Sequence, residues 1–366
     1  MSDRTQAHRR PDAEIILATS ASAGLVAIPV GEQYRWADTA LLVTEGFQRH
    51  KNGVHVLRDL KAMPEVMPAL AHAARQHRVV LTASPRSYLG DYAHELATHL
   101  PGTWTAKVEV YAHPVWQEDW IPLLWDSGEV AEAMEHRRIP YGAVLSDGAG
   151  TELLLIEHPG SARAYLLGAC AASTFDDNYQ NPYAPKSATL PAFARLAALQ
   201  VATEYLPAYE RALHERLLAA VEAGHARLEE IRASGRSDLA RHYAEESTTI
   251  FRRLRPHAAE LLARTRSAVV AGPEDSVVLD RLHGLLNPAG TTGAPRPSVF
   301  IPPRPLMPAS ADEVGQWLAD GPLLLKHART ARPSAPVSGP RPALAPPSRS
   351  LAAPAASVTV RRLPRT

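Results

Sequence analysis

The residues best suited to chemistry are concentrated in the stretch Tyr111–Asp126. Four of the six tryptophans lie in it or just before it, at positions 104, 116, 120 and 125. The same stretch contains one histidine and three carboxylates: His113, Glu118, Asp119 and Asp126. A histidine and a carboxylate that meet in space form a common acid–base pair in catalysis. If a reaction takes place here, we therefore expect acid–base chemistry beside aromatic side chains.

Three interpretations of this stretch compete. The first is a buried helical stripe of Trp116, Trp120 and Leu123 or Leu124, with the acids facing water. The second is a ligand pocket whose walls are the aromatic rings and whose polar anchors are the histidine and the carboxylates. The third is a protein-contact patch that includes Trp116, Trp120 and Trp125, because tryptophan and tyrosine are enriched at interface centres. The sequence favours the first and leaves the others open.

A second unusual stretch, Thr174–Tyr183, is rich in aspartate and asparagine. Its oxygen-bearing side chains include Asp176, Asp177, Asn178 and Asn181. Such oxygens are the ligands that Mg²⁺ and Ca²⁺ prefer, but their spacing is not that of a calcium loop. Asx residues also form turns and cap helices, so a structural turn is favoured over an ion or ligand loop. An enzyme would require this loop to face Tyr111–Asp126.

Two histidine motifs resemble metal sites without matching them. His94 and His99 are five residues apart, whereas the zinc-protease helix places two histidines four apart on one face. Glu222 and His225 have the spacing of half a di-iron helix motif, but the second helix and the further glutamates are missing. We therefore expect no metal ion.

The chain lacks the sequence motifs of several large enzyme classes. It contains no phosphate-binding P-loop, no dinucleotide-binding glycine motif and no G-x-S-x-G nucleophile motif. We therefore expect no cofactor. The single cysteine, Cys170, lies in an apolar run without an adjacent base, which predicts a buried, unreactive thiol.

The composition is that of an ordinary globular protein. The chain has 366 residues, of which 45% are hydrophobic and 21% charged, and its formal net charge is +1. It has 34 arginines and only five lysines, a bias typical of GC-rich genomes such as those of actinobacteria. The N-terminal residues lack the apolar core of a signal peptide, and no apolar run is long enough to span a membrane. A cytoplasmic protein is the expectation.

The first half of the chain predicts an α+β domain over residues 13–190, preceded by a disordered tail at 1–12. The expected strands are 14–19, 24–30, 40–44, 54–57, 79–83, 105–111, 143–145, 152–156 and 164–169. The expected helices are 64–75, 91–100 and 127–136. Turn residues between the strands favour hairpins, so the sheet should be mostly antiparallel with flanking helices.

The second half predicts a helical hairpin and then a tail. Apolar residues at spacings of three and four indicate two long amphipathic helices within 191–272, with Pro207 as a bend or a new start. Residues 273–366 are rich in proline and are expected to be largely disordered, apart from a short helix at 311–328. Residues 331–366 contain six arginines and no acidic residue, a composition that suits weak, non-specific contact with nucleic acid.

These observations favour a non-enzymatic binding or interaction module. A protein partner or a second copy is expected to use the helical hairpin, and no membrane is involved. The first alternative is an enzyme that combines the carboxylates and histidine of 113–126 with the loop at 176–181. The second is a nucleic-acid-associated protein that acts through its basic tail.

Overall fold

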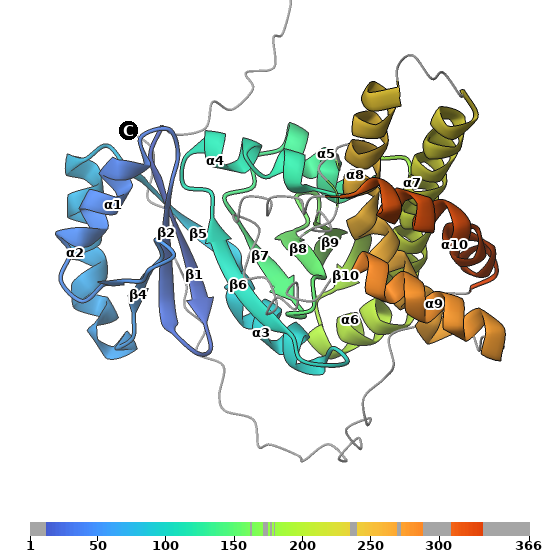
Figure 1. Ribbon diagram of the computed structural model, residues 1–366. Helices are drawn as coiled ribbons and strands as arrows, with labels where there is room; N and C mark the ends of the chain where they lie inside the picture. The colour runs from blue at the N-terminus through green and yellow to red at the C-terminus, as the bar shows by residue number, and fades with distance from the viewer. Residues whose placement is uncertain are drawn as a thin grey trace, which may run out of the picture.

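The computed structural model describes residues 12–161, 163–170, 175, 178, 180–234, 240–268, 272–287 and 309–331, with only the backbone for 240–243. Within these ranges the chain forms two five-stranded sheets and a group of long helices (Figure 1). The predicted α+β class, with mostly antiparallel sheets and a long helical hairpin, is confirmed. The tails at 1–11 and 332–366 lie outside the described residues.

The first sheet has the strand order β3-β4-β2-β1-β5. Its strands are β1 (Glu14–Ser20), β2 (Gly24–Val30), β3 (Gln48–Arg49), β4 (His55–Leu57) and β5 (Val80–Ser87). Along β2 the side chains alternate, so that Val26 and Ile28 enter the main core while Ala27 packs towards the outer helices. Those outer helices are α1 (Tyr34–Leu42) and α2 (Met63–Gln76), with a short 3-10 turn at Leu60–Ala62 before α2. They cover the face of the sheet that points away from the rest of the molecule (Figure 1).

Two expected strands in this region differ from the structure. Residues 40–44 were expected to be extended, but Ala40 and Leu41 belong to α1, where they are buried together with Ala37. Burial at these positions follows the three- and four-residue period of a helix. The strand expected at 79–83 is present as β5, but it is mostly exposed and pairs in parallel with β1 at the end of the sheet.

The second sheet is a fully antiparallel meander with the order β10-β9-β8-β7-β6. Its strands are β6 (Thr105–Val110), β7 (Tyr141–Ser146), β8 (Glu152–Glu157), β9 (Ala164–Ala169) and β10 (Ala188–Pro191). Its middle strands are buried on both faces: in β8, Leu153 and Leu155 join one core cluster while Leu154 and Ile156 join another. Burial on both faces explains why these strands appear in the sequence as unbroken apolar runs.

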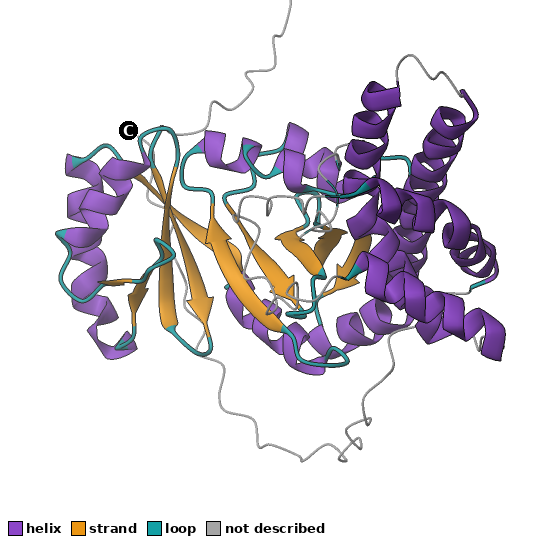
Figure 2. Cartoon of the chain, in the orientation of Figure 1, coloured by secondary structure: helices purple, strands orange, loops and turns teal. Residues whose placement is uncertain are grey.

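Helices cover both faces of the second sheet. One face packs on α3 (Leu89–His99), α6 (Ala194–Gln200) and the long helices. The other packs on a 3-10 turn at Ile121–Leu123 and on α5 (Glu129–His136), and both of these contact α4 (Pro114–Glu118). These two layers lie on opposite sides of the strands (Figure 2). The stretch that was singled out in the sequence thus connects β6 to α5 across one face of this sheet.

The C-terminal helices pack together at the end of the second sheet. They are α7 (Leu206–Ser234), α8 (Ala240–Ala268), α9 (Pro273–Leu286) and α10 (Ala311–Thr330). A π-helical segment at Val201–Tyr205 separates α6 from α7 and ends two residues before Pro207. A proline cannot donate the helical hydrogen bond and crowds the preceding turn, so a local irregularity is expected there.

Helix α9 was not predicted, because residues from 273 onward were assigned to a proline-rich tail. Its buried leucines, Leu279, Leu282 and Leu285, recur every three residues and pack into the main core. Helix α10 occurs where residues 311–328 were expected to be helical, and its Trp317 is fully buried against Phe251 of α8 and His225 of α7. No helix in the described ranges is long and apolar enough to cross a membrane.

Candidate functional site

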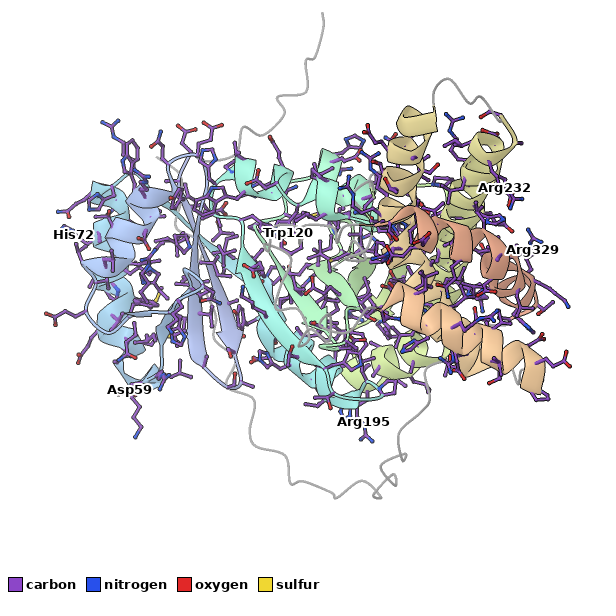
Figure 3. All side chains as sticks on the ribbon, viewed as in Figure 1. Asp59, His72, Trp120, Arg195, Arg232 and Arg329 are labelled. Carbon is purple, nitrogen blue, oxygen red and sulfur yellow. The ribbon has the colours of Figure 1, made fainter. Side chains whose placement is uncertain are left out.

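The stretch Tyr111–Asp126 divides into an outward half and an inward half. His113, Val115, Trp116, Glu118 and Asp119 lie on or beside α4 at the surface, whereas Trp120, Leu124, Trp125 and Asp126 are buried. Figure 3 shows Trp120 directed from this connection towards the sheet, where its ring lies 5.9 Å from that of Tyr111. The single buried stripe predicted for Trp116 and Trp120 is therefore wrong for Trp116.

The outward half forms a small aromatic surface together with α1. The ring of Tyr34 lies 5.2 Å from that of Trp116 and 6.4 Å from that of His113. Trp116 is 43% exposed and its neighbour Val115 is 48% exposed. We call Tyr34, His113, Val115 and Trp116 the aromatic platform. Sequence reasoning selected His113 and Trp116 but missed Tyr34, which is distant in the chain and comes close only through the fold.

A buried glutamine holds the platform in place. Gln117, on the inner side of α4, donates from Nε2 to the carbonyl oxygens of Met134 and Arg137, at 2.8 Å and 2.6 Å. Its Oε1 accepts from Arg138 Nη1 and from the backbone N–H of Ile139, at 3.0 Å and 2.8 Å. Four hydrogen bonds from one side chain fix α4 to the end of α5 and the segment that follows. Trp116 is therefore presented from a rigid position.

The rim of the platform is mainly acidic. Asp119 is the C-cap residue of α4 and follows Trp116 by three residues, so the two lie on the same side of the helix. Glu118 and Glu32 are also exposed near the platform residues in the chain, and the bases there are Arg35 and Arg138, whose guanidinium donates to the carbonyl oxygen of Ala112 at 3.1 Å. His113 serves as the N-cap of α4, where its Nδ1 accepts the backbone N–H of Val115 at 3.3 Å. None of these groups forms an acid–base pair with another in the described contacts.

The inward half meets the second unusual stretch. Trp125 is fully buried, and its Nε1 donates to Asn181 Oδ1 at 3.3 Å. Arg216 of α7 donates from Nη1 to Asn178 Oδ1 at 2.8 Å, and its guanidinium lies 5.3 Å from the centre of the Trp125 ring. The same guanidinium lies 3.7 Å from the centre of the Phe175 ring. Asp176 and Asp177, which were expected to join this site, lie outside the described residues.

The sequence analysis did not select Arg216, although its position on an apolar helix face could have indicated it. It occupies a position beside Leu213 and Leu217 on the buried face of α7, where a charged residue is unusual. A guanidinium stacked on two rings and bonded to an amide is typical of an arginine that organises a packed junction. The contacts of Arg216 therefore attach the asparagine-containing loop to the long helices.

Asp126 has a structural role at this junction. Its Oδ2 accepts the backbone N–H groups of Gly128 and Ala131, at 3.1 Å and 3.0 Å, and the hydroxyl of Ser187 at 2.9 Å. It thereby satisfies free N–H groups at the start of α5. Burial raises the pKa of the Asp126 carboxyl, and these three hydrogen bonds partly offset that rise. Its Oδ1 is buried without a hydrogen-bond partner.

The remaining motifs do not assemble a reactive centre in the described residues. Cys170 is buried, and burial raises the pKa of its thiol, in agreement with an unreactive cysteine. Glu222 pairs with Arg329 at 2.7 Å, while His225 packs edge-on against Trp317. No group of three or more histidine, cysteine or acidic side chains lies close enough to hold a metal ion, as far as the described residues show.

Two open hollows of about 430 Å³ each lie on the described surface. One lies between α5 and the loop at 180–182, where two of the candidate residues, Asp126 and Asn181, line it together with Glu132, Glu135 and His136. The other lies between the β7–β8 turn and the long helices, where Arg264 bonds to Glu260 and Glu210. Neither hollow contains the platform.

Comparisons with known proteins give no relative: no protein-family model, no curated protein and no solved structure matches this chain.

Proposed function

We propose that this chain is a non-enzymatic, cytoplasmic interaction module whose contact surface is the aromatic platform. The observation that carries the proposal is the shared exposure of Val115 and Trp116 beside Tyr34. Large aromatic side chains contribute much of the binding energy at the centres of protein interfaces. A surface that combines aromatic rings with a polar rim has the composition of such a centre.

The placement of the candidate acids and base supports binding over catalysis. An acid–base mechanism needs a histidine and a carboxylate within reach of one reacting atom. His113 caps α4, while Glu118 and Asp119 are exposed on the surface of that helix. Asp126 is buried at the start of α5 and is engaged in capping it. His113, Glu118 and Asp119 are therefore surface residues at α4, whereas Asp126 is a buried helix cap.

The rigidity of α4 also favours a binding role. Ordering flexible side chains or loops on binding costs free energy, and a surface that is already fixed avoids part of that cost. The four hydrogen bonds of Gln117 fix the helix that carries Val115 and Trp116. The platform therefore resembles a surface prepared for contact more than a loosely held side-chain cluster.

The helical hairpin is a weaker candidate for the contact surface. Its two helices, α7 and α8, pack against α9 and α10 of the same chain. Leu324 and Leu325 of α10, together with Trp317, belong to the same core cluster as the hairpin leucines. The apolar face that was expected to receive a partner is thus occupied within the chain.

Site-specific photo-crosslinking in intact cells tests the proposal. A photoreactive amino acid replaces Val115, and a control variant carries it at Val277, which is 59% exposed on α9. We expect a discrete adduct from position 115 only, weakened at least about tenfold by Trp116→Ala. Trp36→Ala is the matched control, because Trp36 is 42% exposed. The same adducts from both positions, or an adduct indifferent to Trp116, would contradict the proposal.

A further inference from the structure

We propose that the arginine- and proline-rich C-terminal segment of this same chain, residues 332–349, docks on the aromatic platform. This inference rests on the proposed function, because it names an occupant for that contact surface. Residues 332–366 lie outside the described part of the structure.

The platform suits a proline-rich ligand. The rings of Tyr34 and Trp116 lie 5.2 Å apart, with their planes inclined at 58°. The exposed Val115 directly precedes Trp116 in the chain. Aromatic-lined surfaces bind proline-rich sequences, whose extended conformation has little entropy left to lose. Residues 332–349 have six prolines, and four of them lie at 340–347, far enough from Ala331 to approach the platform.

The charges of the two partners are complementary. Glu32, Glu118 and Asp119 are exposed close to the platform residues in the chain, where the bases are Arg35 and Arg138. The segment 332–349 contains three arginines, and no acidic residue occurs anywhere in 332–366. A guanidinium can also lie over the face of a tryptophan or tyrosine ring, where the attraction is largest for tryptophan. Arginine next to proline therefore matches both features of the platform, its rings and its acidic rim.

The segment is long enough to reach the platform from the end of α10. A folded chain of this length has a diameter on the order of 50 Å, from its usual radius of gyration. At roughly 3.1 Å per residue, the 18 residues 332–349 extend about 55 Å in a polyproline conformation. Docking within one molecule also benefits from an effective concentration on the order of 1 mM. A segment that binds with a Kd near 0.1 mM would therefore occupy the platform about nine-tenths of the time.

The first experiment uses the purified full chain with the photoreactive residue at position 115. Irradiation followed by mass spectrometry maps the residues joined to it. We expect adducts within 332–349 of the same molecule that disappear in Trp116→Ala and persist in Trp36→Ala. Trp36 is two positions from Tyr34, so it points about 200° away around α1. Adducts to a second copy, or no adduct, would overturn the inference.

The second experiment measures the contact in trans. A fluorescent peptide of residues 332–349 is titrated into the chain ending at Ala331, which keeps every described contact and whose folding is checked by circular dichroism. We expect binding that Trp116→Ala weakens about tenfold, that Trp36→Ala changes less than about twofold, and that added salt weakens. A peptide that binds DNA but not the truncated chain would overturn the inference and favour a nucleic-acid role for the tail.

The two proposals fail in different ways. If position 115 forms adducts with another protein in cells but none with 332–349 in the purified chain, the contact surface stands and its assigned occupant is wrong. If position 115 behaves like position 277 in both settings, the platform is no contact surface and both proposals fail.

Discussion

Asp126 joins three parts of the chain through a single oxygen atom. Its Oδ2 accepts two backbone N–H groups at the start of α5 and the hydroxyl of Ser187, which precedes β10. The hydroxyl oxygen of Ser187 also accepts the N–H of Val130 at 2.9 Å. A carboxylate that looked like a catalytic candidate is thus explained by helix capping.

Replacing Asp126 tests this capping role. Asp126→Ala leaves three partly buried donors without this acceptor and should lower the free energy of unfolding by roughly 1–3 kcal/mol. Asp126→Asn keeps one oxygen acceptor and should cost clearly less, since asparagine also caps helices well. Urea denaturation measures both. Equal losses for the two variants would show that the hydrogen bonds to Oδ2 contribute little.

The buried carboxyl also predicts a pH dependence. Burial raises the pKa of Asp126 above its ordinary value of 3.8, so the folded state holds this proton to higher pH than the unfolded state. The contribution of Asp126 to stability is therefore largest at acidic pH and is lost as the pH rises from about 4 through the folded-state pKa. Asp126→Asn should flatten this part of the stability profile, as measured by denaturation at several pH values. A profile with an unchanged slope would contradict the assignment.

At the residue scale, the sequence identified the residues of the site better than the directions in which their side chains point. Trp116 and Trp120 are four residues apart and would share one face of a continuous helix. They point differently because α4 ends at Glu118 and the chain passes into a 3-10 turn at Ile121–Leu123. The contact between Trp125 and Asn181 depends on a loop closing over 56 residues. No local pattern reveals such a contact.

At the scale of the elements, α10 is held by one large side chain and several ion pairs. Trp317 is fully buried among α7, α8 and α10, whereas the pair between Arg329 and Glu222 lies at the surface. A buried tryptophan removes much apolar area from water. Exposed ion pairs contribute little because water and salt screen them. The attachment of α10 should therefore depend on Trp317.

Two variants of α10 and its partner helix separate these contributions. Trp317→Ala should destabilise the docked helix by roughly 3–5 kcal/mol, and amide hydrogen exchange along Ala311–Thr330 should accelerate strongly. Glu222→Gln removes the surface pair and should change stability by less than about 1 kcal/mol. Comparable exchange rates in the two variants would show that the pair between Arg329 and Glu222 holds α10 as firmly as its buried ring does.

How well a helix or strand was predicted depends on how clear its apolar pattern is in the sequence. The strand at 164–169 was predicted with the limits that the structure shows, because an apolar run of strand length is bounded there by turn residues. Residues 40–44 were misassigned, because a short apolar run fits a strand and the end of a helix equally well. Helix α9 was missed, because the prolines after residue 287 dominated the composition of its surroundings.

At the scale of the whole molecule, the fold separates an inner joint from an outer surface. Trp125, Arg216 and Asn181 join the second sheet to the long helices from within. Tyr34 and Trp116 connect α1, beside the first sheet, to α4, beside the second; Trp116 is exposed to solvent and Tyr34 is half-buried. The sequence could not assign these two roles, because Trp116 and Trp125 come from the same short stretch while their partners lie far away in the chain.

The accessibility of Trp116 relative to Trp36 tests the central claim most directly. The two indoles are exposed by 43% and 42%, so Trp36 is an internal standard within each molecule. Hydroxyl-radical footprinting of the full chain in intact cells, read by mass spectrometry, gives the ratio of their oxidation. If the platform is a contact surface, Trp116 should be oxidised several-fold less than Trp36, and the difference should disappear in the purified chain ending at Ala331. Equal oxidation of the two residues in cells would contradict the account.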